Sequence, residues 1–234
     1  MSMQVVLLTH TPDPERLIYI AGRTCYHSGT LESLWSEAED IDKVRDFVRK
    51  LIKKGHESPL EHASATFYFK GVSRIFLAQI TRHRLASFSV RSHRYTIASP
   101  EEFRTPPKIE ISLPYPIQNE LKEYVQWGYK LYQELIANGI KKEDARFYLP
   151  QGTTTNMVMT ANFREWRHIL KLRLDKHAQW EIREVCKRVL LDLEAIAPSV
   201  FEDFRDYEER EVDEILGYEG NPDRIVVFKK KGGD

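Results

Sequence analysis

Apolar positions along the chain recur with two different periods, and each period predicts a different kind of element. Helical spacing predicts helices over 14–23, 41–54, 117–138 and 179–197, with a shorter one over 141–147. The last long helix places Ile182, Val185, Cys186 and Val189 on one apolar face. Short apolar or alternating runs over 3–8, 63–70 and 153–160 predict strands.

Capping signals indicate where several helices begin. Residues 58–61 and 162–165 both have the pattern of a capping box, and the second opens a helix that ends near Arg173. Asp13 is expected to cap the first helix, and Ser73 one that runs to about Leu85. Five prolines between Pro100 and Pro116 predict an extended surface loop or lid.

Composition favours one folded domain. The chain has 234 residues and 41% hydrophobic content, and we expect a single domain over 1–216 with a C-terminal extension over 217–234. We see no secretory leader and no apolar run of membrane-spanning length, so we expect a cytoplasmic protein without a membrane partner. Two cysteines are too few for a disulfide framework or a four-cysteine metal site.

Charge is segregated along the chain. The 35 acidic and 35 basic side chains balance, yet no acid lies between His62 and Pro100, where the basic residues are Lys70, Arg74, Arg82, Arg84, Arg91 and Arg94, accompanied by His83 and His93. Arginine forks and serine hydroxyls suit phosphate oxygens, and the interleaved aromatics suit a flat ring. This pattern predicts a site for a phosphorylated heterocycle. A nucleic-acid patch, or arginines paired with acids from elsewhere, would give the same pattern.

The predicted helix that starts at Ser73 gives this basic run two directions. At about 100° per residue, Gln79, Arg82 and His83 share one face, and Arg84 points roughly 200° away from Arg82. Two anionic ligands, such as a dinucleotide cofactor and a nucleotide substrate, would account for this arrangement.

The run Arg82-His83-Arg84, followed by seven residues and Ser92, resembles the signature of the flavin-dependent thymidylate synthases, the ThyX family. Blocks at 56–62, 145–150, 162–164 and 172–181 are similar to that family in the same order. The resemblance implies an α+β fold, which we expect as one domain with a mixed β-sheet packed by several helices. It also implies a homotetramer that binds FAD and methylates dUMP, using 5,10-methylenetetrahydrofolate and NADPH as co-substrates.

The resemblance also assigns site residues. The implied FAD contacts are Ser58, Arg82, His83, Arg84, Val90, Asn162, Phe163, Arg164 and His168. The implied dUMP contacts are Gln79, Ile80, Thr81, Arg82, Val90, Arg91, Ser92, His93, Arg94, Arg146 and Arg173. Val90 departs from the glutamate or glutamine common in relatives, so its contacts must come from backbone atoms. Each site is expected to combine Gln79, Arg82 and Arg173 of one chain with Ser92, Arg94 and Arg146 of a neighbouring chain.

Arg173 is the catalytic residue that the resemblance implies, because its fork can favour the N3-deprotonated pyrimidine. No enzyme thiolate is then needed: Cys186 is expected in the core, and Cys25 diverges from the nearby His27. No metal site is predicted, because 56–62 lacks the His-Glu-x-x-His spacing. The alternatives are a nucleic-acid-binding module that uses residues 70–94 and a flavoprotein that has lost methylation.

Overall fold

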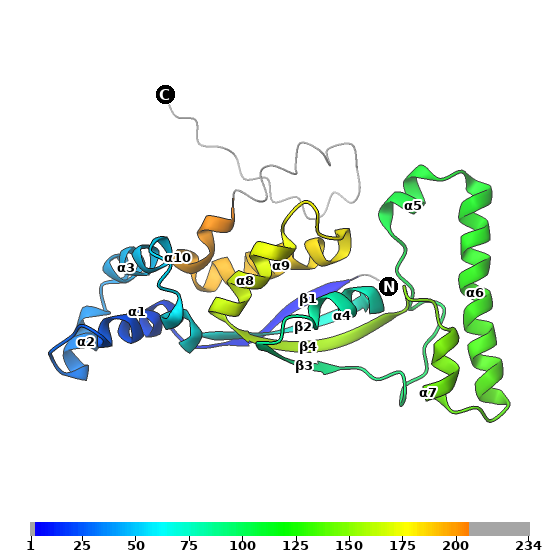
Figure 1. Ribbon diagram of the computed structural model, residues 1–234, viewed down its shortest axis with the longest axis horizontal. Helices are drawn as coiled ribbons and strands as arrows, with labels where there is room; N and C mark the ends of the chain where they lie inside the picture. Colours follow the sequence, from blue (N-terminus) through cyan, green and yellow to red (C-terminus); the bar gives the residue numbers. More distant parts are fainter. Residues whose placement is uncertain (1–2, 206–234) are drawn as a thin grey trace.

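A four-stranded antiparallel sheet forms the centre of the protein in a computed structural model that describes residues 3–205 (Figure 1). Its order is β1-β2-β4-β3, with β1 at Gln4–His10, β2 at Ser64–Ser73, β3 at Ala86–Val90 and β4 at Thr154–Asn162. Every neighbouring pair of strands is antiparallel. The prediction of an α+β fold is confirmed.

The prediction of a mixed sheet is wrong, and the placement of the helices explains why. The connection between β1 and β2 lies beyond one end of the sheet, and the connection between β3 and β4 lies beyond the other (Figure 1). The chain therefore re-enters the sheet at the end where it left, which makes neighbours antiparallel, whereas a parallel neighbour needs a crossover to the opposite end. Of the connections between strands within residues 3–205, only the one through α4 crosses back along the sheet, and it leads to β3, which β4 separates from β2.

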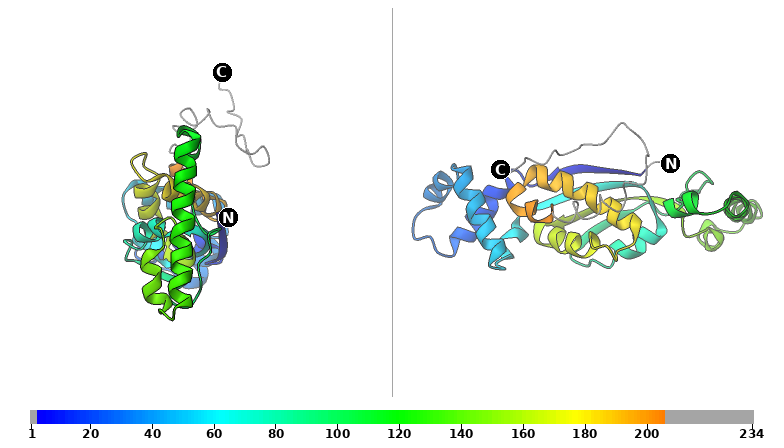
Figure 2. Two further views of the ribbon diagram at one scale, coloured as in Figure 1. Left: turned by 90° about the vertical axis from the view of Figure 1, so that its right-hand side faces the viewer. Right: turned by 90° about the horizontal axis from the view of Figure 1, so that it is seen from above.

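Helices occupy three places around the sheet (Figures 1 and 2). One group lies beyond one end: α1 (Pro14–Thr24), α2 (Leu31–Glu37) and α3 (Ile41–Lys53), followed by the 3-10 turn η1 (Ser58–His62). A second group lies beyond the other end: α5 (Pro107–Ser112), α6 (Tyr115–Ala137), α7 (Lys142–Ala145) and the turn η2 (Arg146–Tyr148). The third covers one sheet face: α4 (Arg74–Ile80), α8 (Phe163–Arg173) and α9 (Trp180–Ile196), followed by α10 (Pro198–Phe201) and η3 (Glu202–Phe204).

The main core fills the space between the sheet and these covering helices. Alternate β2 residues Ala65, Phe67 and Phe69 are buried, and the residues between them are more exposed, because side chains alternate between faces along a strand. In β3 the same alternation turns Val90 towards the core, against which it packs, and leaves Ser87 and Ser89 exposed. The side chain of Val90 is therefore directed away from the open face of the sheet.

Several predicted boundaries need correction. The turn η1 is a 3-10 helix without a side-chain cap bond, so the predicted capping box at Ser58 is wrong. Asp13 makes no side-chain cap bond either. The predicted loop over 100–116 contains α5 and the start of α6, and α2 was not predicted. Asn162 and Ser73 are confirmed as caps, accepting bonds from the backbone N–H of Glu165 (2.8 Å) and Phe76 (3.0 Å) respectively.

The most consequential correction concerns the basic run. Helix α4 ends at Ile80, where the Thr81 hydroxyl donates back to the Leu77 carbonyl at 2.8 Å. The next residues form a turn in which the His83 N–H donates to the Ile80 carbonyl at 3.1 Å, and the alternating run 86–90 becomes strand β3. Arg82, His83 and Arg84 are therefore not helical, and the helical angles that gave them two directions do not apply.

The predicted extension over 217–234 lies outside the described residues. Among residues 3–205, no helix is both long and apolar enough to cross a membrane. The same residues contain no group of three or more histidine, cysteine, aspartate or glutamate side chains arranged to hold a metal ion.

Candidate active site

Four residues from the end of α4, the turn after it and the two ends of α8 are linked through His83, and we call Gln79, His83, Glu165 and Arg173 the Arg173 cluster. The Arg173 Nε donates to His83 Nε2 at 3.0 Å, and its Nη2 donates to the Gln79 carbonyl at 3.1 Å. On the other side of the imidazole, His83 Nδ1 lies 3.6 Å from Glu165 Oε1. One segment, 79–83, thus fixes the guanidinium of a residue about 90 positions later in the chain.

The electrostatics of this cluster follow from burial. His83 is only 5% exposed, and burial, followed by the charges of Arg173, His168 and Arg82, lowers its pKa to about 4. The imidazole is therefore neutral at physiological pH. Burial also lowers the pKa of Arg173 and raises the pKa of Glu165. Within residues 3–205 no carboxylate forms an ion pair with Arg173, so its charge is held by neutral acceptors.

A small cavity lies beside this cluster, at the start of β3 and the end of β4. Its volume is about 320 Å³, and it is lined by Ser64, Arg84, Leu85, Ala86, Ser87, Thr160, Ala161 and Asn162. Arg82 and Arg84 are exposed, and in the described part of the chain neither has an ion-pair partner. The structure thus brings two predicted FAD contacts, Arg84 and Asn162, to one cavity beside the N-terminus of α8.

A second group of predicted residues lies near α6 and α7, and we call Arg91, Arg94, Glu102, Glu143 and Arg146 the Arg91 cluster. Arg91 donates through both Nη atoms to the two Glu102 oxygens, each at 2.7 Å. This bond is the leading cause that raises the pKa of Arg91 and lowers the pKa of Glu102. Arg94 pairs with Glu143, whose carbonyl accepts from Arg146 Nε at 3.1 Å. Acids from later in the chain therefore compensate this part of the basic run.

Two further predicted dUMP contacts lie beside the Arg91 cluster. The Ser92 hydroxyl accepts from the Arg94 N–H at 3.2 Å, which shapes the turn after β3. His93 is 3% exposed, and burial is the first cause that lowers its pKa. Its Nε2 has no hydrogen-bond partner in the described structure.

Strand β3 sets the residues before it, including His83, apart from those after it, including Arg91. Ala86 pairs with Ala161, and the Arg91 N–H donates to the Asn156 carbonyl at 2.9 Å. Five residues along the strand separate these two points, which corresponds to roughly 16 Å. Among residues 3–205, no hydrogen bond or ion pair joins Arg173 to Ser92, Arg94 or Arg146.

The other predicted residues occupy varied environments. Arg164 is exposed and pairs with Glu61 at 2.5 Å, and His168 is an exposed neighbour of His83, with ring centroids 5.8 Å apart. Ser58 is exposed in η1, whereas Ile80 is buried. The Phe163 side chain is fully buried against Phe201, with centroids 5.2 Å apart, so it is a core side chain.

Sequence reasoning missed the carboxylates that organise both clusters. Glu165 was assigned only to a capping box, and Glu102 and Glu143 lie outside the basic run, so no local signal connected them to it. Glu181 was also given no role. It is buried and accepts from the Ser73 N–H at 2.8 Å, and it lies 3.3 Å from Arg104. It therefore anchors the start of α4 and indirectly places Gln79.

Cys186 is in the core, as expected. Cys186 is 2% exposed, and burial raises its pKa to about 12 despite the opposing charge of Arg173. A thiol with this pKa stays protonated near neutral pH. Cys25 is exposed.

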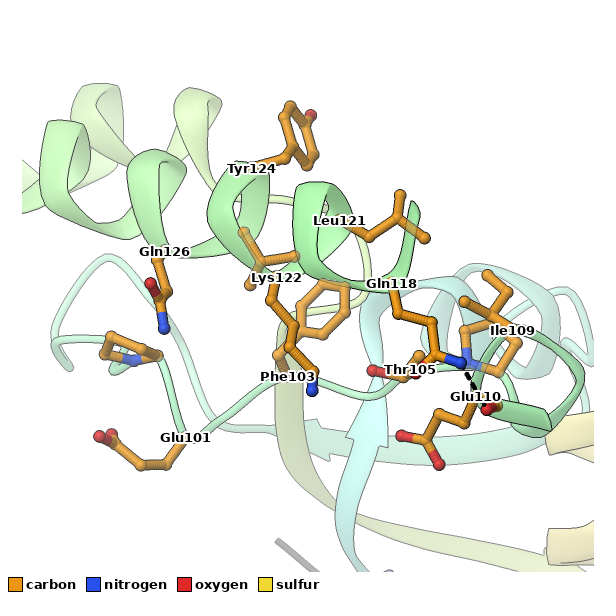
Figure 3. A pocket seen from close by; sticks show the side chains of 13 residues that line it. Glu101, Phe103, Thr105, Ile109, Glu110, Gln118, Leu121, Lys122, Tyr124 and Gln126 are labelled. Atoms are coloured by element: carbon orange, nitrogen blue, oxygen red, sulfur yellow. Dashed lines mark hydrogen bonds between the residues drawn. The ribbon is translucent and has the colours of Figure 1, made fainter. Parts of the chain in front are cut away.

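An apolar cavity lies between α5, the first half of α6 and residues 100–106 (Figure 3). Its volume is about 490 Å³, and apolar side chains such as Phe103, Ile109 and Leu121 line it. Gln118 closes one side by donating to the Glu110 carbonyl at 3.0 Å (Figure 3). None of the predicted site residues lines this cavity.

The fold and the Arg173 cluster define an α+β protein with an uncompensated arginine site. A family model described as Thymidylate synthase complementing protein matches residues 6–199, and the chain belongs to this family. A flavin-dependent thymidylate synthase of Geobacter sulfurreducens is 37% identical over 201 residues, covering 86% of each chain. One of Pyrococcus abyssi is 35% identical over 198 residues, covering 82% of this chain and 79% of the relative.

A solved structure is similar as well. The crystal structure of the UMP/dUMP methylase PolB from Streptomyces cacaoi, bound with 5-Br dUMP, matches with a TM-score of 0.74. The match covers 87% of this chain and 94% of that chain at 23% sequence identity. At this identity the similarity shows that the two proteins share a fold.

Proposed function

We propose that the protein is a flavin-dependent thymidylate synthase, a methyltransferase that converts dUMP to dTMP. The one-carbon group comes from 5,10-methylenetetrahydrofolate, and FAD, when bound and reduced by NADPH, supplies the hydride that completes the methyl group. The observation that carries this proposal is the half-buried Arg173 guanidinium, held by neutral acceptors in a chain of this family. The relatives bear the name of this activity, and PolB was crystallised with a dUMP analogue.

Arg173 is the catalytic residue in this proposal. A guanidinium has five N–H donors, and the bonds to His83 and Gln79 use two of them. The remaining donors would meet the pyrimidine edge and stabilise its N3-deprotonated form, which makes C5 a better nucleophile. Each unit by which the N3 pKa falls corresponds to about 1.4 kcal/mol. The buried, protonated thiol of Cys186 fits a reaction without an enzyme thiolate.

The residues around the small cavity fit an anionic dinucleotide. Asn162 caps α8, whose N-terminus favours negative charge, and the exposed Arg84 lines the same cavity. Arg82, Ser58 and His168 would complete the FAD site, and Arg164 would join it by leaving Glu61. Phe163 would contribute no side-chain contact, because its ring is in the core. Val90 would contribute backbone atoms, since its side chain packs inward.

The dUMP site would be shared between chains. Gln79, Ile80, Thr81, Arg82 and Arg173 would come from one chain, and Ser92, Arg94 and Arg146 from its neighbour. The length of β3 supports this arrangement, because it separates Arg82 from Ser92 and Arg94 within one chain. Of the other motif residues, Arg91 and His93 would support the site from within, as Arg91 is committed to Glu102.

A homotetramer would supply that neighbour. The α6 helix exposes several large apolar side chains, among them Tyr115, Ile117, Tyr124 and Trp127, of which Trp127 is 63% exposed. A helix with so much exposed apolar surface is typical of an interface. A nucleic-acid-binding function is not favoured. Glu102 and Glu143 pair with Arg91 and Arg94, so the basic residues do not form a continuous positive surface.

The deciding experiment is conversion of dUMP to dTMP by the purified protein, with FAD, 5,10-methylenetetrahydrofolate and NADPH each omitted in turn. We expect a yellow protein and dTMP formation only in the complete mixture. A protein that binds FAD and oxidises NADPH but makes no dTMP would be the alternative named above, a flavoprotein that has lost methylation. A colourless protein that binds single-stranded DNA tightly would contradict the proposal.

The ligand assignments have their own test. Arg84→Ala should mainly weaken FAD retention and Arg94→Ala should mainly weaken dUMP binding, each by about 1.5 to 3 kcal/mol as expected for a charge-assisted contact. Equilibrium titrations that give the opposite assignment would reverse the two sites.

A further inference from the structure

His83 differs from the two arginines beside it in the signature. Arg82 and Arg84 are exposed, whereas His83 is 5% exposed and its imidazole lies between Arg173 and Glu165. The resemblance assigned all three residues to FAD. In the structure, the only polar partners of the His83 ring among residues 3–205 belong to the Arg173 cluster.

The bond between Arg173 and His83 fixes the protonation state of the ring. An arginine guanidinium can only donate, so His83 Nε2 must be an unprotonated acceptor. The single ring proton of the neutral imidazole is then on Nδ1, which faces Glu165 Oε1 at 3.6 Å. This separation is longer than a hydrogen bond but close enough for the carboxylate to favour the Nδ1–H tautomer.

The same bond fixes the direction of the guanidinium. Nε and Nη2 of Arg173 both donate to rigid acceptors, the buried imidazole and the Gln79 carbonyl at the end of α4. Two bonds from one planar fork hold its plane as well as its position. The edge that remains is the one available to a pyrimidine.

We propose that His83 is a positioning residue for Arg173, with its tautomer set by Glu165, and is not a flavin contact. This inference rests on the proposed function, because it assigns to Arg173 the task of activating dUMP. The charged and titratable groups that face His83 are Arg173, Glu165, His168 and Arg82. Glu165 becomes a further residue of the site through its effect on His83.

Two substitutions separate positioning from simple packing. In His83→Gln the terminal amide oxygen reaches about as far as Nε2 and can accept from Arg173, whereas the shorter amide of His83→Asn reaches only about as far as Nδ1. The two variants have similar polarity and remove the same ring. A packing role would lower the stability of both variants, most in the smaller His83→Asn, and a flavin-contact role would lower their FAD content.

The experiment compares both variants with the wild type at saturating dUMP. We expect His83→Asn to retain FAD and its reduction by NADPH while kcat for dTMP falls roughly 100-fold, the loss typical of a displaced catalytic group. His83→Gln should recover to within about tenfold of wild type. Equal loss of kcat in both variants, or loss of bound FAD in His83→Asn, would overturn the proposal.

Glu165→Gln tests the second contact. We expect kcat to fall by roughly three- to tenfold, because the amide keeps the shape but removes the charge that favours the Nδ1–H tautomer. Glu194→Gln is the matched control, since Glu194 pairs with Arg205 on the surface of α9. Unchanged kcat in Glu165→Gln would remove Glu165 from the proposal.

A measurement without turnover distinguishes failure of this inference from failure of the proposed function. Histidine ring nitrogens can be labelled with ¹⁵N and assigned with His83→Gln. We expect a neutral His83 with the proton on Nδ1, and a changed Nε2 shift in Arg173→Ala. A proton on Nε2 would overturn the positioning role even in an active enzyme, and absence of dTMP formation would leave this result standing.

Discussion

The Arg173 cluster and the Arg91 cluster each hold an arginine, and they treat its charge in opposite ways. Arg91 and Arg94 are paired with Glu102 and Glu143, so their charge is compensated within the chain. Arg173 is held by an imidazole nitrogen and a backbone carbonyl, which fix its direction without neutralising it. Both kinds of contact position an arginine, but only the second leaves its charge for a ligand.

This difference shows how a structural arginine can be told from a functional one. A carboxylate partner takes both the donors and the charge of the guanidinium, and removing an anionic ligand changes little. A neutral acceptor takes donors only, so the cost of partial burial is recovered when an anion binds. Burial lowers the pKa of Arg173, whereas pairing raises the pKa of Arg91.

The largest expected effect is the loss of Arg173. Arg173→Ala should keep FAD and its reduction by NADPH, but dTMP formation should fall roughly 100- to 1,000-fold, as for removal of an electrostatic catalyst. Arg173→Lys should recover little, because an ammonium keeps the charge but not the planar fork. Single-turnover and steady-state assays of both variants measure the effect. Arg16→Ala, at a partly exposed arginine that lies 4.0 Å from Asp13, is the control. Near-normal dTMP formation by Arg173→Ala would make Arg173 another structural arginine.

The second test asks whether the two clusters cooperate across chains. Arg173→Ala and Arg146→Ala chains, each inactive alone, are co-expressed so that they mix at random. About a quarter of shared sites should then receive an intact Arg173 from one chain and an intact Arg146 from another, and activity should recover accordingly. Hybrid tetramers verified by mass spectrometry that remain as inactive as either parent would show that each site is built within one chain.

The third test concerns folding stability at low pH. The buried His83 of the Arg173 cluster should make the fold less stable as the pH falls. The pKa of His83 is about 4 in the folded chain against an ordinary value of 6.5, so the unfolded state binds the proton more readily. Its contribution to stability is therefore complete above pH 6.5 and is lost as the pH falls towards 4, by roughly 2 to 3 kcal/mol. The raised pKa of Glu165 acts in the opposite direction and reduces the net change.

Urea unfolding of wild type and His83→Gln at pH 7 and pH 4.5 measures this contribution. The wild type should lose more stability between the two pH values than the variant, because both retain the other titrating groups. Identical losses would mean that His83 is not held neutral by the fold.

Elements with a strong local pattern could be predicted from sequence. Helix α3, helix α9 and the cap at Asn162 follow from spacing and side-chain type, and the structure confirms them. The end of α4 could not be predicted, because the basic residues after Ile80 are compatible with a helix and only the pairing of β3 with β4 decides otherwise. The antiparallel sheet depends on which end of the sheet the helices occupy, and apolar periodicity does not encode that.

The candidate site likewise has a part that the sequence could predict and a part that it could not. The signature residues themselves are local, and the sequence predicted Arg173 as part of the site. Their partners come from far along the chain, as Glu165 does for His83 and Glu102 does for Arg91. The separation of acids and bases along the sequence therefore did not reveal which arginines the fold compensates.

The fourth prediction measures that compensation. Glu102→Gln should destabilise the protein by about 1 to 3 kcal/mol, because it leaves the half-buried Arg91 without its bidentate partner. Glu143→Gln is the matched control, since the Arg94 side chain is 56% exposed and such a pair contributes about 0 to 1 kcal/mol. Thermal unfolding in parallel gives the comparison.

The pH dependence of this difference has a definite sign. Arg91 lowers the pKa of Glu102 below its ordinary value of 4.5, so the pair stabilises the fold above that pH and loses its effect as the pH falls through the folded value. The difference between wild type and Glu102→Gln should therefore shrink on acidification. A difference that grows at low pH, or equal effects of Glu102→Gln and Glu143→Gln, would contradict the structural role of Arg91.

The smallest effect is expected from the cysteines, although Cys186 lies near Arg173 in the first cluster. A Cys25→Ser, Cys186→Ala double variant should form dTMP within about twofold of the wild-type rate, because the Cys186 thiol stays protonated and Cys25 belongs to neither cluster. The small buried gap left by Cys186→Ala should cost about 1 kcal/mol of stability, so both single variants serve as folding controls. A folded, FAD-bound double variant that makes no dTMP would show that a thiolate carries the chemistry here assigned to an uncompensated arginine.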